Sequence, residues 1–460
     1  MKKYILIILC CLTSFPLWSY NVNMIVEHYS VDQGLPNNTV NCTLKDRDGF
    51  IWFGTWYGLC CFDGVKFKTF NKQEHDSDVP PRKIQRIVED KNGYIWVKTI
   101  DRKLYVFNKV TECFHAVYDD MKNYSENIQV IKLQNTAEGD VLLLTKDKNL
   151  LLAGVDEKGQ VTIKILFDSR NEINKHDYTL KHHVLCETEE YISWIGTDYK
   201  VAAVHKGSEL ASRPADFITS KINSGDKDSF TSFFEDGRKV WVGDRAGIFY
   251  SIDVRTGLVN RYVLSEIKGA ISNLLVTPAG YVYLSVAGQG TYEYDLAERR
   301  LQKINTEMND AMVTHAFIDQ YDKIWFHENE KALIYYDPLN HTAKRFPFTM
   351  FGKITTLYSE DAGERGLFFL SPAGEAWLFD REHAEMVYIN KLKQLSNDRT
   401  NQQFYHLMLD NDGVLWLSSA DEGVYCMNFP KKQFNLLSLS PQSAGQENYT
   451  IGVRALFQSK

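Results

Sequence analysis

Short apolar runs separated by polar turns recur along this chain, and the clearest pair lies near its start. Within residues 46–63, the polar turn Asp46–Gly49 leads into the apolar run Phe50–Phe53, and a second apolar run follows Gly58. Gly49 and Gly58 stand where a tight reversal requires a positive φ angle, and β-branched and aromatic residues fill the runs between them. The pattern therefore predicts short β-strands joined by tight turns.

This unit is repeated along nearly the whole chain. Each copy contains an anchor residue, usually aromatic, in its strongest apolar strand. The nine anchors are Trp52, Trp96, Leu142, Trp194, Trp241, Tyr283, Trp325, Phe368 and Trp416. Their spacing averages about 45 residues, the length of one four-stranded propeller blade. Such apolar strands suit sheets covered on both faces, and no stretch shows a sustained helical period. The sequence thus predicts an all-β fold, a β-propeller of four-stranded blades.

The number of blades has two interpretations. Nine copies favour a single ring that uses every copy. A seven-bladed ring followed by an incomplete second propeller is the alternative, because nine exceeds the usual range of roughly four to eight blades. Met24–Tyr29 has the pattern of a fourth strand that precedes the first copy. We expect this strand to complete the last blade and so leave no open edge.

The ends of the chain differ from the repeats. Residues 1–19 combine a basic start, an apolar run and small residues, which predicts a signal peptide cleaved after Ser19. A lipoprotein anchor on Cys10 or Cys11 is the rival interpretation. We expect the propeller to span residues 22–430, and residues 431–460 to form a linker and the first strand of a truncated repeat. Later stretches lack the roughly 18 apolar residues of a membrane span, so we expect the mature chain to be exported and soluble.

Charge and cysteine content narrow the chemistry. The formal net charge of −7 comes without a basic block, so we expect no nucleic-acid partner. The cysteines beyond residue 19 are scattered and lack the spacing of a zinc site, so core packing is the favoured interpretation. We expect no cofactor.

Catalytic and metal motifs are weak. Asp46–Gly49 and Asp410–Gly413 could be taken for calcium loops, but neither continues to the Glu that an EF-hand loop requires at its twelfth position. We interpret both as turns before an anchor strand. Neither a nucleophile–base pair nor a zinc motif can be assembled, so we predict no catalytic residue, no metal ligand and no enzyme. A propeller glycan hydrolase or lyase is the alternative.

One stretch carries a family resemblance. Leu35–Asn41, followed by Asp48–Thr55 and Gly58–Leu59, resembles the two-component-regulator propeller repeat. That repeat builds the periplasmic sensors of hybrid two-component systems in gut Bacteroidetes, which typically respond to oligosaccharides. In the family, two propellers and an immunoglobulin-like domain precede a membrane helix, a histidine kinase, a receiver and a DNA-binding domain.

The resemblance implies a role for this chain. It implies the amino-terminal, ligand-sensing part of such a sensor, without output domains, in a family anchored in the inner membrane. The implied partners are an oligosaccharide, a second propeller, an immunoglobulin-like domain, and a second copy in a homodimer of the full-length protein. A structural docking scaffold for a second propeller is a further alternative.

The loops that follow the anchor strands are the predicted site. They fall at equivalent positions in every copy, so we expect them on one face of the ring. Aromatic rings beside polar groups suit the faces and hydroxyls of sugars, although ordinary solvated loops have similar compositions. The candidate ligand-binding residues are Trp56, Tyr57, Asp198, Tyr199, Asp244, Arg245, Gln289 and Asn329.

Overall fold

The computed structural model describes most of the region between residues 25 and 428. The described residues are 25–70, 80–122, 124, 128–169, 180–196, 201–207, 230–304, 313–328, 331–351, 358–361, 366–371, 375–391 and 404–428. Helical structure within them is limited to α2 (Tyr118–Met121) and the 3-10 turns η1 (Val31–Gln33) and η2 (Phe348–Phe351). None of these described helices is long and apolar enough to cross a membrane. The predicted signal peptide and the segment 431–460 lie outside the described residues.

The described strands form nine antiparallel sheets, named blades 1 to 9 in chain order. Blade 1 consists of β2 (Val40–Lys45), β3 (Ile51–Thr55), β4 (Gly58–Phe62) and β5 (Phe67–Phe70), and blade 2 of β6 (Ile84–Glu89), β7 (Ile95–Thr99), β8 (Leu104–Asn108) and β9 (Cys113–Ala116). Blade 3 consists of β10 (Val130–Asn135), β11 (Val141–Thr145), β12 (Leu150–Val155) and β13 (Val161–Phe167), and blade 4 of β14 (Leu180–Glu187), β15 (Tyr191–Gly196) and β16 (Val201–His205).

Blades 5 to 9 follow the same order of strands. Blade 5 consists of β17 (Phe230–Glu235), β18 (Lys239–Asp244), β19 (Ile248–Asp253) and β20 (Leu258–Val263), and blade 6 of β21 (Ile271–Val276), β22 (Tyr281–Val286), β23 (Gly290–Asp295) and β24 (Arg300–Lys303). Blade 7 consists of β25 (Val313–Ile318), β26 (Ile324–Glu328), β27 (Ala332–Asp337) and β28 (Thr342–Pro347), and blade 8 of β29 (Tyr358–Asp361), β30 (Leu367–Leu370), β31 (Glu375–Asp380) and β32 (Glu385–Lys391). Blade 9 consists of β33 (Phe404–Leu409), β34 (Val414–Ser419), β35 (Val424–Asn428) and β1 (Ile25–Tyr29).

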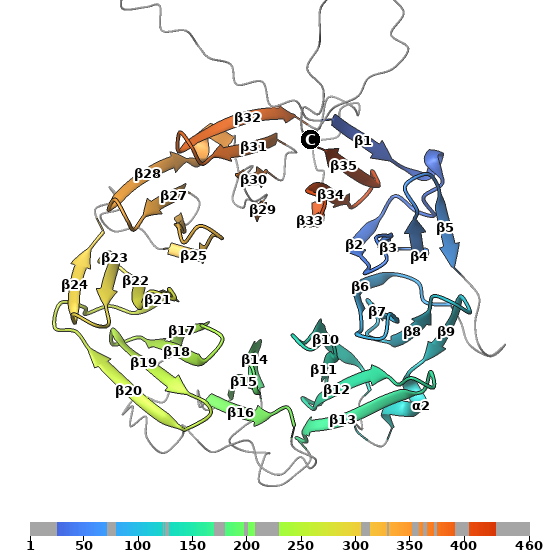
Figure 1. Cartoon of the computed structure of the whole chain (residues 1–460), viewed down its shortest axis with the longest axis horizontal. Helices are drawn as coiled ribbons and strands as arrows, with labels where there is room; N and C mark the ends of the chain where they lie inside the picture. Colours follow the sequence, from blue (N-terminus) through green and yellow to red (C-terminus); the bar gives the residue numbers. More distant parts are fainter. Residues whose placement is uncertain are drawn as a thin grey trace, which may run out of the picture.

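The sheets surround one central axis, with the first strand of each blade nearest to it (Figure 1). In blade 9, β1 pairs antiparallel with β35, from Ile25 opposite Asn428 to Tyr29 opposite Val424. The strand that precedes the first repeat therefore completes the last blade, as expected, although Met24 itself lies outside the described residues. The predicted all-β propeller fold is confirmed.

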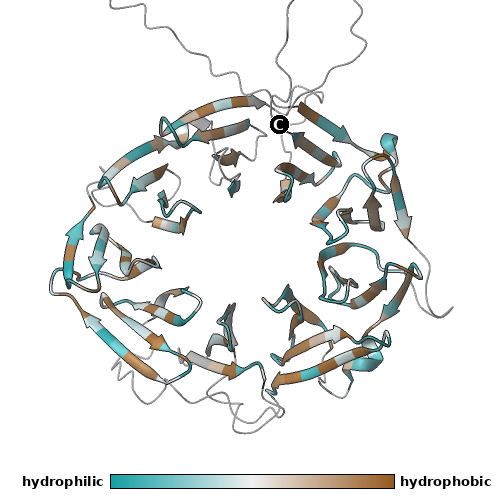
Figure 2. Cartoon of the chain, in the orientation of Figure 1, coloured by the Kyte–Doolittle hydropathy of each residue, from teal (hydrophilic) through white to brown (hydrophobic). Residues whose placement is uncertain are grey.

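The anchors form the core between blades. All nine lie in the second strand of their blade, and none is more than 5% exposed. Trp96, for example, packs with Val130 and Leu133 of blade 3. Hydrophobic and hydrophilic residues alternate along the outermost strands, such as β13 and β20 (Figure 2). Burial between sheets on both faces explains why the second strands are continuously apolar.

The turn before an anchor strand serves a second purpose. Asp90 Oδ1 accepts hydrogen bonds from the backbone N–H groups of Asn92 and Tyr94, and its Oδ2 accepts one from Trp96 Nε1 at 2.9 Å. The same bond to an anchor indole joins Asp46 to Trp52, Asp236 to Trp241, Asp319 to Trp325 and Asp410 to Trp416. The acidic turns predicted from the sequence therefore also bind the buried indoles.

The innermost strands are bulged. In seven described blades, the register with the second strand shifts by one residue near the start of the first strand. The extra residue can reach the neighbouring blade: Asn41 Nδ2 donates to Ile84 O at 2.6 Å, and Thr231 Oγ1 donates to Ile271 O at 2.7 Å. These bulges decide which side chains project toward the axis.

Candidate ligand-binding face

The turns after the anchor strands lie beside the segments that lead into the next blade. Lys83 N donates to Trp56 O at 2.9 Å, Val130 N donates to Arg102 O at 2.9 Å, and Gly423 N donates to Asn38 O at 2.8 Å. Each bond joins a turn of one blade to a connection between blades. We call the side of the ring formed by these turns and connections the post-anchor face.

Trp56 and Tyr57 form the turn between β3 and β4 on this face. Their side chains are 37% and 61% exposed. The Lys83 ammonium lies 5.3 Å from the centre of the Trp56 ring, so a cation supports one side of the indole. Large aromatic groups held open to solvent in this way can stack on the apolar face of a ligand.

The other described candidates differ in whether their side chains are free to bind a ligand. Asp244 is 2% exposed, and its carboxylate accepts hydrogen bonds from Ala246 N and Ile248 N. Burial raises the pKa of Asp244, and its role in the turn is structural. Gln289 is bonded at both ends, to Lys268 N and to Glu266 O, and so ties its turn to the connection between blades 5 and 6. Arg245, in contrast, is exposed.

The described members of the predicted set do not form one pocket. Figure 1 places the β3–β4 turn and the β18–β19 turn on opposite sides of the central axis, which separates Trp56 from Arg245. Asp198, Tyr199 and Asn329 lie outside the described residues. Of the predicted set, Trp56 and Tyr57 are therefore the exposed aromatic pair with a defined setting.

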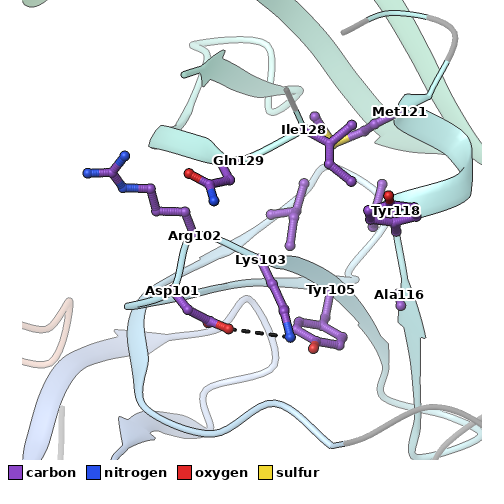
Figure 3. Close-up of a pocket in the computed structure, with 11 residues that line it drawn as sticks. Asp101, Arg102, Lys103, Tyr105, Ala116, Tyr118, Met121, Ile128 and Gln129 are labelled. Carbon is purple, nitrogen blue, oxygen red and sulfur yellow. Dashed lines mark ion pairs between the residues drawn. The ribbon is translucent and has the colours of Figure 1, made fainter. Parts of the chain in front are cut away.

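A cavity of about 400 Å³ lies between blades 2 and 3, beside the turn that follows β7. Figure 3 shows Tyr105, Tyr118, Met121 and Gln129 around it. The Asp101 carboxylate and the Lys103 ammonium form a 3.4 Å ion pair at one side. The repeat pattern gives no signal for this cavity, because α2 and the connection before β10 belong to no repeat.

A cluster of carboxylates on the turns before the anchors resembles a metal site. Oxygens of Asp46, Asp48 and Glu89 lie within 4.8 Å of one another. However, the Lys109 ammonium contacts all three, at 3.1, 2.7 and 2.8 Å. Burial alone would lower the pKa of Lys109, but its hydrogen bonds to the carboxylates raise it. A side-chain cation already balances these negative charges.

The same arrangement recurs at other blade interfaces. Lys206 bridges Glu138 of blade 3 and Glu187 of blade 4, and it occupies the position equivalent to Lys109. Arg381 likewise bridges Asp319 of blade 7 and Asp361 of blade 8. We therefore assign the carboxylate cluster to packing between blades. The calcium interpretation of the Asp46 turn has no support in this geometry.

Comparison with known proteins gives one family match. Residues 34–57 match the family described as "Two component regulator propeller". A search of curated proteins found no match. The matched segment begins before the first blade and ends at Tyr57, so it includes the exposed Trp56–Tyr57 turn.

Similar solved structures share little sequence identity with this chain. The extracellular domain of BT4673 from B. thetaiotaomicron is 15% identical, with a TM-score of 0.31, over 86% of this chain and 65% of that one. The extracellular domain of BT3049 from B. thetaiotaomicron, described as a hybrid two component system, is 14% identical, with a TM-score of 0.34, over 90% and 61%. A streptogramin B lyase is 10% identical, with a TM-score of 0.37, over 89% and 98%.

The chain thus spans less than two thirds of the length of the two extracellular domains. At these identities the likenesses concern the fold alone. The family match rests on residues 34–57, which the structure places at the start of blade 1 with the bulge, the indole-binding Asp46 and the post-anchor turn of a propeller repeat. The chain is a β-propeller whose residues 34–57 match the two-component-regulator propeller family.

Proposed function

We propose that this propeller is the ligand-sensing region of a periplasmic two-component sensor, and that its post-anchor face binds an oligosaccharide. The observation that carries the proposal is the exposed Trp56–Tyr57 turn, which belongs to the matched repeat itself. Signalling output belongs to further domains of a longer protein. In the proposed arrangement, a second propeller and an immunoglobulin-like domain follow this ring, and two copies of the full-length protein associate.

The chemistry of the face suits a sugar. Trp56 offers a flat apolar surface backed by Lys83, and stacking of this kind contributes about 0.5–1.5 kcal/mol beyond burial of area. Asp101, Lys103 and Gln129 border the neighbouring cavity with hydrogen-bonding groups. Its volume of about 400 Å³ falls within the range of small-molecule sites. An apolar platform and converging polar groups are the two requirements for sugar recognition.

Calorimetry of the full chain against a panel of neutral and acidic oligosaccharides tests this function. We expect Trp56→Ala to lower the affinity for a bound oligosaccharide about tenfold, with the melting temperature unchanged, because a stacking surface is lost from an exposed turn. Tyr388→Ala is the matched control, since Tyr388 is 48% exposed on the outer strand β32. This control should bind as the wild type does.

Two results would contradict the proposal. If no oligosaccharide binds the wild-type chain, the docking scaffold becomes the better account. Release of monosaccharide or of an unsaturated product during the titration would instead establish a glycan hydrolase or lyase.

A further inference from the structure

A buried lysine lies at the axis side of blade 2. Lys98, near the end of β7, is 6% exposed, and its ammonium donates a hydrogen bond to Gln85 Oε1. It is two residues from Trp96, so the two side chains lie on the same face of the sheet, which packs against blade 3. Removing a cation from water is unfavourable unless a negative charge accompanies it.

The charged neighbours of Lys98 are also cations. Arg86 on β6 lies directly opposite Lys98 in the register of the two strands, where like charges are destabilising. Arg102 follows in the turn after β7, with a φ angle of 68°. Among the described residues, no carboxylate pairs with any of these three side chains.

The proximity of the three cations affects the pKa of Lys98. Burial, followed by the charges of Arg102 and Arg86, lowers the pKa of Lys98. Other largely buried cations of this ring are paired with carboxylates. Lys109 and Arg381 each lie between carboxylates of two blades. The group on blade 2 is thus a concentration of positive charge without the counter-charge found elsewhere.

We propose that Lys98, Arg86 and Arg102 form an anion-binding site, which receives a carboxylate or sulfate group of the ligand. Two guanidinium groups and a buried ammonium supply the charge-assisted hydrogen bonds that bind such groups strongly. Arg86 and Arg102 are exposed, so an anion can reach the site from solvent. Arg102 also borders the neighbouring cavity, and Figure 3 shows its side chain extending away from Tyr105 and Tyr118.

The site adjoins the aromatic turn through the backbone. Lys83 N donates to Trp56 O, and Lys83 O accepts from Ile100 N at 2.9 Å, so the Trp56 turn and the Ile100–Arg102 turn share one connection. One ligand can therefore stack on Trp56 and place its anionic group on Arg102 and Lys98. If the face binds an oligosaccharide, as proposed above, that oligosaccharide is acidic and bears uronate or sulfate groups.

The test uses inorganic sulfate as the probe. The melting temperature of the full chain is measured in sodium sulfate and in sodium chloride at equal ionic strength, and sulfate affinity is measured by calorimetry. We expect sulfate to raise the melting temperature of the wild type, and Lys98→Met to lower sulfate affinity about tenfold or more. In chloride alone, Lys98→Met should melt at or above the wild-type temperature, because an uncompensated buried charge is removed.

Lys68→Met is the matched control. Lys68 is exposed on the outer strand β5 and paired with Glu112, so its removal should leave the sulfate response intact. Should Lys98→Met fail to fold, Arg102→Gln at the surface gives the same readout and should weaken the response.

Two outcomes overturn the anion site. One is an undiminished sulfate response in both Lys98→Met and Arg102→Gln. The other is a wild-type chain that melts at the same temperature in sulfate and chloride.

The ligand class is tested separately with glucuronate-containing, sulfated and neutral oligosaccharides. Preference for a neutral sugar would overturn the acidic ligand. A sulfate response that persists while no oligosaccharide binds would refute the proposed sensor function and leave the anion site standing.

Discussion

At the scale of single residues, the acidic turn and the anchor depend on each other. Asp46, Asp90, Asp319 and Asp410 each stand six residues before a tryptophan anchor and accept its indole N–H. Where Thr136 and Thr277 replace the aspartate, the anchors are Leu142 and Tyr283, which have no indole. Thr188 before Trp194 departs from this rule. A buried N–H needs an acceptor, and the two positions change together within the one chain.

Asp90→Ala tests this dependence. The carboxylate accepts two backbone N–H groups and the Trp96 indole, and Asp90 is 1% exposed. Removing it leaves a buried donor unsatisfied, so we expect a loss of about 3 kcal/mol in the free energy of unfolding.

Asp63→Ala serves as the comparison. Asp63 also accepts two backbone N–H groups of its turn, but it is exposed and binds no indole. Asp63→Ala should lower the free energy of unfolding by about 1 kcal/mol or less. Chemical denaturation of both variants measures the difference, and equal losses would show that the indole bond contributes nothing.

The repeat pattern predicted which residues form the core, but it did not predict which surface residues come together. Anchors such as Trp325 follow from burial, which the repeat pattern encodes directly. The position of Lys83 over Trp56 depends on the residues just before β6, which the repeat pattern does not specify. Likewise, Arg86 and Lys98 come together because a bulge at Gln85 sets the register of β6 and β7. Neither the bulge nor the connection leaves a periodic signal.

At the scale of elements, β1 is the strand that joins a sheet formed by the other end of the chain. Its five residues pair with β35, nearly 400 positions later. His28 Nε2 bonds Glu422 O, and the Tyr29 ring packs against Phe62 at 5.0 Å between ring centres. The sequence predicted this pairing because the strand fitted the repeat but had no blade of its own. Ring closure supplied the missing partner.

A chain that begins at Ser30 tests the closure. Loss of β1 leaves β35 as an open edge and uncovers Trp416, so we expect a single cooperative transition at a clearly lower melting temperature. Ile25→Ala is the matched control, because Ile25 is 53% exposed and its loss keeps the strand. A truncated chain that melts at the wild-type temperature would show that β1 does not hold the ring together.

At the scale of the whole molecule, nine described sheets share one axis. The alternative of seven blades and an unfinished second propeller would place blades 8 and 9 outside the ring. Instead, β2 of blade 1 contacts β33 and β34 of blade 9, and Lys45 pairs with Asp410 and Asp412 across the same boundary. Blade 9 therefore packs against blade 1 in the same way as neighbouring blades pack along the chain.

Single-particle images of the purified chain, averaged down the ring axis, test this count. We expect nine radial densities, since each sheet is a repeat of the same strand order and the first and last are paired. Averages with seven radial densities and an attached partial ring would contradict the arrangement.

The antiparallel register of β1 and β35 also sets the mechanical behaviour of the ring. Ile25 lies opposite Asn428, so the chain enters and leaves the pair at the same end. A force that separates these two points opens the ladder one residue pair at a time, like a zipper, whereas a shearing geometry would load all the bonds at once. Tension on the two ends of the chain therefore opens the ring within blade 9, between β1 and β35, before any other blade carries the load.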